Sequence, residues 1–376
     1  MRSYLRAGLL LGFVVAACRD SIGPKTMANP QATTAQMEAL DTLFDISVLN
    51  SFSALAGEIA PVAPARLARI RALAAVSNPL ARSSALRPYT QGLESARMVR
   101  QLVPTLTDAS TAALFPPEVV GKTFEWNDTT DMYVATARTG APSTGVRFIL
   151  YAVDPLTNMP VEPVVEVGYV DLDDESTASV AKLHVTVAGV GGTPVYVDYT
   201  VSLGNVSTTS ARIMTSGYIT KGAGSPDTLA FNGSVTVAAN ASSVSVTQDV
   251  NLDVNSRDLH IRHFEKITLT ESTASLRIYF RFQHGPEVVT LDGTLSFDDI
   301  AQTANGTITV RVDGGLMATC TVAADANSYS LTCQGADADG LNADEQAALE
   351  AAGDAVGKVQ EIFSGLFGPP IGILGA

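Results

Sequence analysis

The sequence predicts a mainly β protein with flanking α-helices, in which a long antiparallel meander forms a curled sheet, a sandwich or an incomplete barrel. Two patterns predict it. From Lys122 to residue 335, apolar and polar residues alternate with the period of a β-strand. On both sides of this section, apolar residues recur at helical spacing instead. We therefore expect an antiparallel β domain over residues 118–335, covered by N-terminal and C-terminal helices.

The clearest alternating run extends from Val195 to Leu203. Its odd-numbered positions are Val, Val, Tyr, Val and Leu, so one face of this strand is expected to be buried. Strands joined by short turns must pair antiparallel, because a parallel pair needs a crossover of about a dozen residues. The expected strands lie at 146–153, 164–172, 180–188, 195–203, 210–220, 228–238, 243–254, 259–270, 275–283, 287–297, 306–313, 316–323 and 328–333, with a hairpin-like segment at 124–133.

Three segments of the β section are alike, and each has Asn-Gly or Asp-Gly at its centre. They are Phe231–Val235, Leu291–Leu295 and Ala304–Ile308. Such dipeptides are typical of tight hairpin turns. We expect repeated hairpin connections here, since the unequal spacing of the copies argues against a solenoid.

Residues 33–117 are expected to be helical. Thr33 and Gln36 have the spacing of a capping box, and Gly57 can end the helix that follows. Further helices are expected near 64–76 and 92–103. The apolar stripe of the first helix consists of Met37, Leu40, Phe44, Val48 and Leu55.

The segment 61–103 contains seven arginines and a single acid, Glu94. Such a region can bind anionic lipid head groups. Alternatively, its arginines can form the solvated face of short helices or pair with the acidic sheet that follows. The second explanation is favoured, and the role of the region stays open.

The C-terminal segment 336–376 returns to helical spacing. Asn342 and Glu345 have the pattern of an N-cap with its reciprocal acid. The apolar stripe that follows consists of Leu349, Val356, Val359, Phe363 and Leu366, and no charged side chain follows Glu361. We expect this helix and the apolar tail to pack on the sheet.

The first residues have the pattern of an export signal. Two arginines precede a short apolar run from Ala7 to Ala17, which is too short to span a membrane. Val15-Ala16-Ala17-Cys18 resembles the lipobox of bacterial lipoproteins, with Val15 where most members have Leu. The resemblance covers only this signal. It divides the start of the chain into a signal peptide, 1–17, and a lipid anchor and tether, 18–32.

The resemblance implies that Cys18 becomes the first mature residue and carries diacylglycerol, so that the membrane is a partner. Two or three acyl chains anchor a protein durably, whereas one does not. Arg19 directly follows Cys18, and an Asp at that place would favour the inner membrane in enterobacteria. The implied location is therefore the outer membrane, on its periplasmic or its surface side.

The net charge excludes one class of partner. The formal charge is −14 at pH 7, and removal of Arg2 and Arg6 with the signal makes the chain more acidic. Nucleic-acid binding needs a basic surface, so no nucleic-acid partner is expected.

Cys320 and Cys333 are expected to form a disulfide. They fall opposite each other if the turn around Asp325 to Ser328 joins two neighbouring strands in a two-residue hairpin. Export supplies the oxidising surroundings that such a bond needs. Two reduced buried thiols are the alternative.

The histidines and acids predict neither a metal site nor a cofactor. His260 and His263 point to opposite faces of a strand, and all four histidines are expected to be polar surface residues. Asp171, Asp173, Asp174 and Glu175 form an acidic loop, and 337–340 resembles the start of a calcium loop. Both lack the full calcium-binding pattern and are expected to be solvated turns.

The sequence contains no complete catalytic motif. Ser179 and Lys182 match a four-residue Ser/Lys pattern without its companion motifs, and they diverge on a strand. Trp126 can stack on a sugar or a lipid head, although a lone Trp is more often a core or cross-strand residue.

We therefore expect a non-catalytic envelope lipoprotein with a binding or scaffolding body. In architecture alone, a curved sheet closed by helices resembles periplasmic carriers of lipoproteins and lipids, which implies an apolar or lipid ligand. The alternative is an envelope hydrolase, which a buried His with a carboxylate would favour.

Overall fold

The structure, a computed structural model, describes most of the β section and parts of both flanking regions. It describes residues 24–44, 46–55, 113–352 and 355, with gaps at 155, 158, 205–206, 208, 223, 226, 271, 299–302, 326–328 and 338. The predicted signal peptide, the predicted lipidation residue Cys18 and the Arg-rich segment 61–103 lie outside the described residues. The helices expected at 64–76 and 92–103 lie there too.

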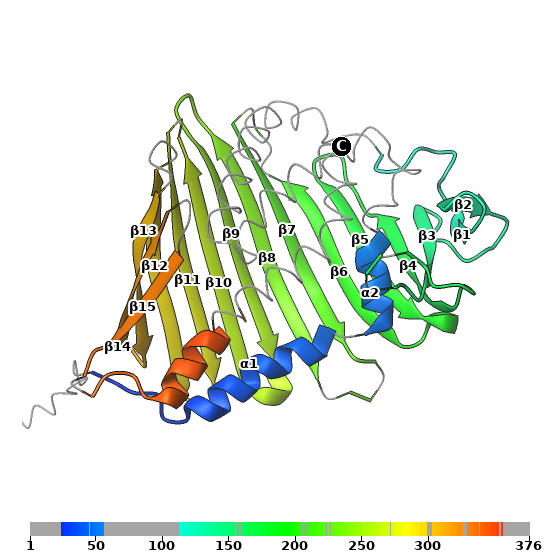
Figure 1. The fold of residues 1–376 in the computed structure, drawn as a ribbon. Coiled ribbons are helices and arrows are strands. Elements are labelled where there is room, and N and C mark those ends of the chain that lie inside the picture. Colours follow the sequence, from blue (N-terminus) through cyan, green and yellow to red (C-terminus); the bar gives the residue numbers. More distant parts are fainter. Residues whose placement is uncertain are drawn as a thin grey trace, which may run out of the picture.

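The described strands form one 15-stranded, unclosed sheet that follows the chain from β3 to β15 (Figure 1). Each strand from β3 onward pairs antiparallel with the next, which confirms the predicted meander and excludes a two-sheet sandwich within the described residues. The strands are β1 Thr123–Asn127, β2 Met132–Thr136, β3 Gly145–Tyr151, β4 Glu166–Asp174, β5 Ala181–Gly189, β6 Val195–Gly204, β7 Ser210–Thr220, β8 Thr228–Ala239, β9 Val244–Val254, β10 Leu259–Leu269, β11 Thr273–His284, β12 Glu287–Asp298, β13 Thr303–Val312, β14 Gly315–Ala324 and β15 Tyr329–Gly335.

One pair of strands is parallel. β1 pairs antiparallel with β2 on one side and parallel with β3 on the other, with Thr123 opposite Arg147. The expectation that strands joined by short turns pair antiparallel holds for β1 and β2. β1 and β3 are not joined by a short turn, because β2 and residues 137–144 return the chain to the end of the sheet where β1 began.

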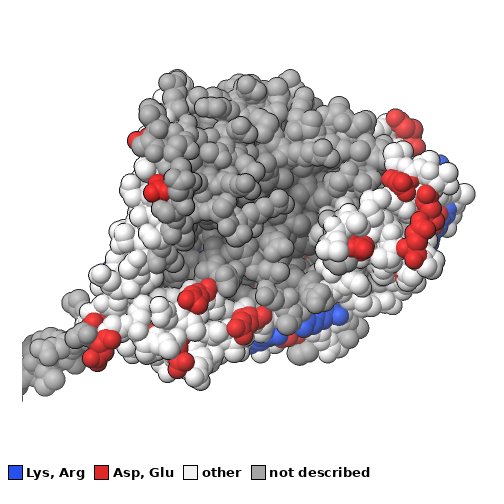
Figure 2. Space-filling model, viewed as in Figure 1, with Lys and Arg blue, Asp and Glu red and all other residues white. Residues whose placement is uncertain are grey.

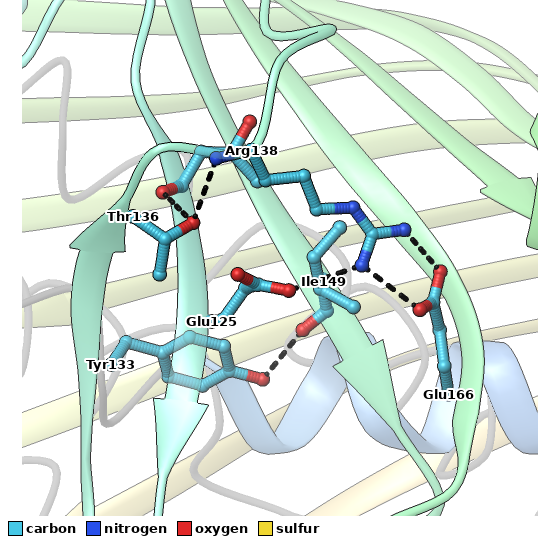
Figure 3. A network of polar contacts seen from close by, with 7 residues as sticks. Glu125, Tyr133, Thr136, Arg138, Ile149 and Glu166 are labelled. Carbon is cyan, nitrogen blue, oxygen red and sulfur yellow. Dashed lines mark hydrogen bonds and ion pairs between the residues drawn. The ribbon is translucent and has the colours of Figure 1, made fainter.

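A network of polar contacts holds this edge hairpin on the sheet (Figure 3). The Arg138 guanidinium lies 3.1 Å from a carboxylate oxygen of Glu125 on β1 and 2.8 Å from one of Glu166 on β4. The Tyr133 hydroxyl donates a 2.9 Å hydrogen bond to the carbonyl of Ile149. Burial and the nearby Glu125 and Glu166 raise the pKa of Tyr151 to about 12. The network therefore joins four strands around the parallel pair.

The sheet has one apolar and one polar face. In β9, buried and half-buried residues alternate along the whole strand, as period-two hydropathy predicts. The residues predicted to share the buried face of β6 do so, since Val197, Tyr199, Val201 and Leu203 are buried. The main apolar cluster extends over this face from β1 to β11.

Helices cover part of the apolar face near its two ends (Figure 1). α2 (Ser47–Ala54) contacts β3, β4 and β5 through Val48, Leu49 and Phe52. Near the other end, Ala348 is buried in a cluster with residues of β12, β13 and β14. It belongs to a helix over residues 343–352. Asn342 and Glu345 cap this helix reciprocally at 3.1 Å and 2.9 Å, as predicted.

The first helix begins earlier and ends earlier than expected. α1 (Pro30–Phe44) starts at a proline, and the Asn29 side chain accepts the Ala32 N–H at 3.0 Å. The prediction that Thr33 caps this helix is therefore wrong, because the buried Thr33 hydroxyl instead donates to Glu287 at 3.3 Å. The single helix expected up to Leu55 is in fact the pair α1 and α2.

The repeated Asn-Gly and Asp-Gly segments are not hairpin turns, which corrects that expectation. Gly233, Gly293 and Gly306 lie inside β8, β12 and β13. A Cβ on Gly293 would lie 2.8 Å from Cγ1 of Ile308, and one on Gly306 would lie 2.6 Å from Cδ2 of Leu295. These glycines therefore make room for apolar side chains of the neighbouring strand.

Candidate functional site

The apolar face of the sheet is interrupted by polar side chains in the middle of β10. Leu259, Ile261 and Leu269 are buried at the two ends of this strand. Between them, the positions on the same face are His263 and Glu265, because alternate residues of a strand share a face. Two ionisable side chains therefore lie within an apolar surface.

The pair is buried and close together. His263 has no exposed surface and Glu265 is 4% exposed. Nε2 of His263 lies 3.5 Å from Oε2 of Glu265. Neither ring nitrogen of His263 forms a hydrogen bond in the part of the chain that the structure describes. Leaving such a buried group without a hydrogen bond costs about 1–3 kcal/mol.

The strand register places one more polar residue and one aromatic residue beside the pair. Gln248 on β9 lies opposite Glu265 and is itself buried. Val250 and Phe280 flank His263 on the two sides, and the His263 and Phe280 ring centroids are 6.5 Å apart. We call Gln248, His263 and Glu265 the inner polar group. Their nitrogen and oxygen atoms can donate and accept hydrogen bonds within an otherwise apolar surface.

Another buried polar atom, Oγ1 of Thr215, lies in line with His263 across the strands of the sheet. Thr215 on β7 is connected to His263 by the register through Gly233 and Val250. Its Oγ1 is buried and makes no hydrogen bond with any described residue. Three strand spacings of about 4.8 Å separate it from His263, so the two side chains do not contact each other directly.

The other histidines confirm by contrast that His263 is unusual. His184 and His260 are partly exposed on the polar face, where His184 Nε2 lies 2.9 Å from Asp198. The expectation that all four histidines are surface residues is therefore wrong for His263. The expectation fails because His263, like the apolar Leu259 and Ile261, is an odd-numbered residue of β10 and therefore lies on the same face of the strand.

The predicted disulfide is present. Cys320 and Cys333 are directly opposite each other in β14 and β15 and are bonded, with their Cα atoms 3.9 Å apart. Cys18, the predicted lipidation residue, lies outside the described residues. The disulfide and the inner polar group are therefore separate features of the sheet.

The acidic residues near β4 serve structural contacts. β4 extends to Asp174, so the expectation of a loop is wrong for most of this segment. Asp171 pairs with Arg147 at 2.7 Å, and Glu175 pairs with Lys182 at 2.7 Å. Asp174 accepts the Leu114 N–H at 3.0 Å. Among the described residues, no group of three or more His, Cys, Asp or Glu could hold a metal ion.

Trp126 is a cross-strand partner. It lies opposite Tyr133 in the β1–β2 hairpin, with an edge-to-face ring contact at 5.6 Å. It lies far from β10 in the strand order, so it does not contribute to the inner polar group.

The alternation of residues along each strand could have identified the inner polar group from the sequence. His263 and Glu265 continue the series Leu259, Ile261 along one face, and Gln248 continues the series Val244, Val246 on the preceding strand. The register between these two strands is what brings Gln248 opposite Glu265.

No family model, curated protein or solved structure matches this chain. Within the described residues, no helix has the length and apolar character that a membrane span requires.

Proposed function

We propose that this chain is a lipid-anchored, outer-membrane protein of the cell envelope that binds an amphiphile against the apolar face of its sheet. The observation that carries the proposal is the buried His263–Glu265 pair in the middle of that face. A surface that served only folding would gain nothing from a buried imidazole without a hydrogen bond. A ligand with an apolar body and a polar group would use both properties of the surface.

The chemistry of the site selects the ligand's polar group. Glu265 already lies beside His263 in a buried position, and a further buried charge there would be costly. A neutral hydrogen-bonding group, such as a hydroxyl, ester or amide, avoids that cost. We therefore propose a neutral amphiphile such as a monoacylglycerol. The Cys18 anchor would keep this binding surface at the membrane that supplies such molecules.

The test compares two double variants of β10. His263→Leu with Glu265→Met removes the pair from the apolar face. His260→Leu with Arg262→Met changes residues at the same spacing on the polar face and is the matched control. Both are titrated, after delipidation, with a fluorescent twelve-carbon acyl probe that is displaced by monopalmitoylglycerol.

We expect saturable binding by the wild-type chain and by the control. The inner double variant should bind monopalmitoylglycerol about tenfold more weakly, because leaving the polar group of the bound ligand without a hydrogen bond costs about 1–3 kcal/mol. Its unfolding midpoint without ligand should stay unchanged or rise, since a costly buried pair has been replaced by apolar groups. Equal affinity in the two double variants, or no binding by the wild type, would refute the proposal.

A second candidate, an envelope hydrolase, is favoured by the same pair. An imidazole beside a carboxylate resembles a general base and its orienting group, and Nε2 of His263 lies 3.5 Å from Oε2 of Glu265. However, the register partners of His263 and Glu265 include no Ser, Thr or Cys that could act as nucleophile. Hydrolysis of a nitrophenyl acyl ester that disappears only in the inner double variant would favour this candidate over binding alone.

A further inference from the structure

A group of exposed apolar side chains lies at one end of strands β3 to β6. We call it the rim patch, and it consists of Leu156, Met159, Val164, Val165 and Val190. Four of these residues belong to the β3–β4 connection, and Val190 begins the 3-10 turn η3 (Val190–Gly192) after β5. Leu156 is 92% exposed, Val190 58% and Val165 52%. These are most of the large exposed apolar residues among the described ones.

The patch is held in place by the sheet. In the β3–β4 connection, the Ala152 N–H donates to the Val165 carbonyl at 2.8 Å, and the Asp154 N–H donates to the Met159 carbonyl at 2.9 Å. Gly168 lies opposite Gly189. The start of β4 therefore lies beside the end of β5, and Val164, Val165 and Val190 lie on neighbouring chain segments. A grouping of exposed apolar residues of this kind is typical of an interaction site.

The topology places this patch on the rim where the N-terminal segment enters the fold. In an antiparallel meander, the β3–β4, β5–β6 and β13–β14 connections all lie at the same rim. Lys25 lies at the β13–β14 turn, where its N–H donates to Leu316 at 2.9 Å and its Nζ lies 3.8 Å from Asp313. Figure 1 shows α1 running along this rim. Cys18 precedes Lys25 by seven residues, which span at most roughly 25 Å.

We propose that the rim patch inserts into the surface of the lipid bilayer as a second attachment point. This inference rests on the lipid anchor of the proposed function, because that anchor would hold the β14 end of the same rim within about 25 Å of the bilayer. The tether meets the sheet near β14 and the patch lies at β3 to β6, so the two contacts together would fix the orientation of the sheet. A tether alone would leave the body free to rotate.

The charge of the chain indicates how the contact is made. The formal charge is −14, and Figure 2 shows more acidic than basic side chains on the face in view. Attraction to anionic lipid is therefore not expected, and burial of apolar side chains drives the contact instead. The patch should bind zwitterionic lipid, and it should bind anionic lipid more weakly.

The test measures which rim of the sheet contacts the bilayer. The chain from Arg19 to Ala376 carries an N-terminal histidine tag. This tag attaches the protein to phosphatidylcholine vesicles that contain a nickel-chelating lipid. Leu156→Cys places a fluorophore in the rim patch. Ser272→Cys places it in the exposed β10–β11 connection on the opposite rim and is the control. Cys320 and Cys333 are bonded to each other, so each variant has a single free thiol. Brominated lipid quenches a probe that enters the bilayer.

We expect brominated lipid to quench the probe at residue 156 at least threefold more than the probe at residue 272. Adding Val165→Asp should remove most of that difference. Equal quenching of both probes, or none, would overturn the rim contact. Incorporation of palmitate at Cys18 is measured separately in cells, so failure of the anchor and failure of the rim contact give different results.

Discussion

His260 and Asp253 face each other across β10 and β9 on the polar side of the sheet, with Nδ1 of His260 2.5 Å from Oδ1 of Asp253. Nε2 of the same ring lies 3.4 Å from Asp258 in the turn between the two strands. The hydrogen bond to Asp253 is the largest cause that raises the pKa of His260, and Asp258 raises it further. The turn between β9 and β10 therefore places one imidazole between two carboxylates, which favour its protonated form.

This pair predicts a pH dependence of stability. Because the pKa of His260 is raised in the folded state, its stabilisation is complete below the unfolded-state pKa of about 6.5 and is lost as pH rises through the folded-state pKa. We expect the difference in melting temperature between wild type and His260→Gln to shrink as pH rises from about 5 to 9. Melts across that range check it, and a constant difference would contradict it.

The disulfide gives a second prediction. Cys320 and Cys333 are separated by 13 residues, and closing a loop of about this size stabilises the folded state by about 3 kcal/mol in the chain-entropy model. The double variant Cys320→Ala, Cys333→Ala should lose about that much free energy of unfolding in denaturant titrations. Wild type measured with reductant should behave like the double variant, and identical midpoints with and without reductant would argue against a stabilising bond.

The strand pattern could be read from the sequence almost completely, because one buried face imposes a strict period of two. Where prediction failed, a tertiary contact decided the local structure. Gly293 lies inside a strand since Ile308 needs its space, although Asp-Gly is typical of a turn. β1 pairs parallel with β3 through a crossover that no local signal marks. The sequence could show that His263 lies on the apolar face of its strand, but its lack of a hydrogen bond depends on what surrounds it in the fold.

Gly168 tests how α2 attaches to the sheet. A Cβ on Gly168 would lie 2.1 Å from the Ala188 carbonyl oxygen and 3.0 Å from Cγ2 of Val48 on α2. Gly168→Ala must therefore displace backbone and helix, and it should cost about 1–3 kcal/mol of unfolding free energy. The control is Gly204→Ala, whose Cβ would meet, among the described residues, Met214 Cε at 3.4 Å. Chemical denaturation of both variants decides, and equal stabilities would show that the close approach of Ala188 and Val48 to Gly168 is dispensable.

Cys18 carries the prediction on membrane attachment, and it lies outside the described residues. Because the lipobox-like Val15-Ala16-Ala17-Cys18 implies a thioether-linked lipid, Cys18→Ala should abolish palmitate labelling and release the chain into soluble fractions. Cys320→Ala with Cys333→Ala is the control, since it removes the other two cysteines of the chain. Labelling that persists in Cys18→Ala would refute lipidation at this residue.

The last prediction concerns how the C-terminal segment continues beyond the described helix. Ala348, Ala352 and Ala355 are buried in the apolar clusters of the sheet, so the helix enters the region of the apolar face along a stripe of small residues. Phe363 lies outside the described residues, but its spacing continues the apolar stripe of Leu349. We predict that this segment packs on the sheet, so Phe363→Ala should cost about 3 to 5 kcal/mol and lower the melting temperature of the unlipidated chain. Glu350→Ala, at an exposed position of the same helix, should leave that temperature nearly unchanged. If the segment instead docks on a membrane or another protein, Phe363→Ala would melt like the wild type and weaken only that association.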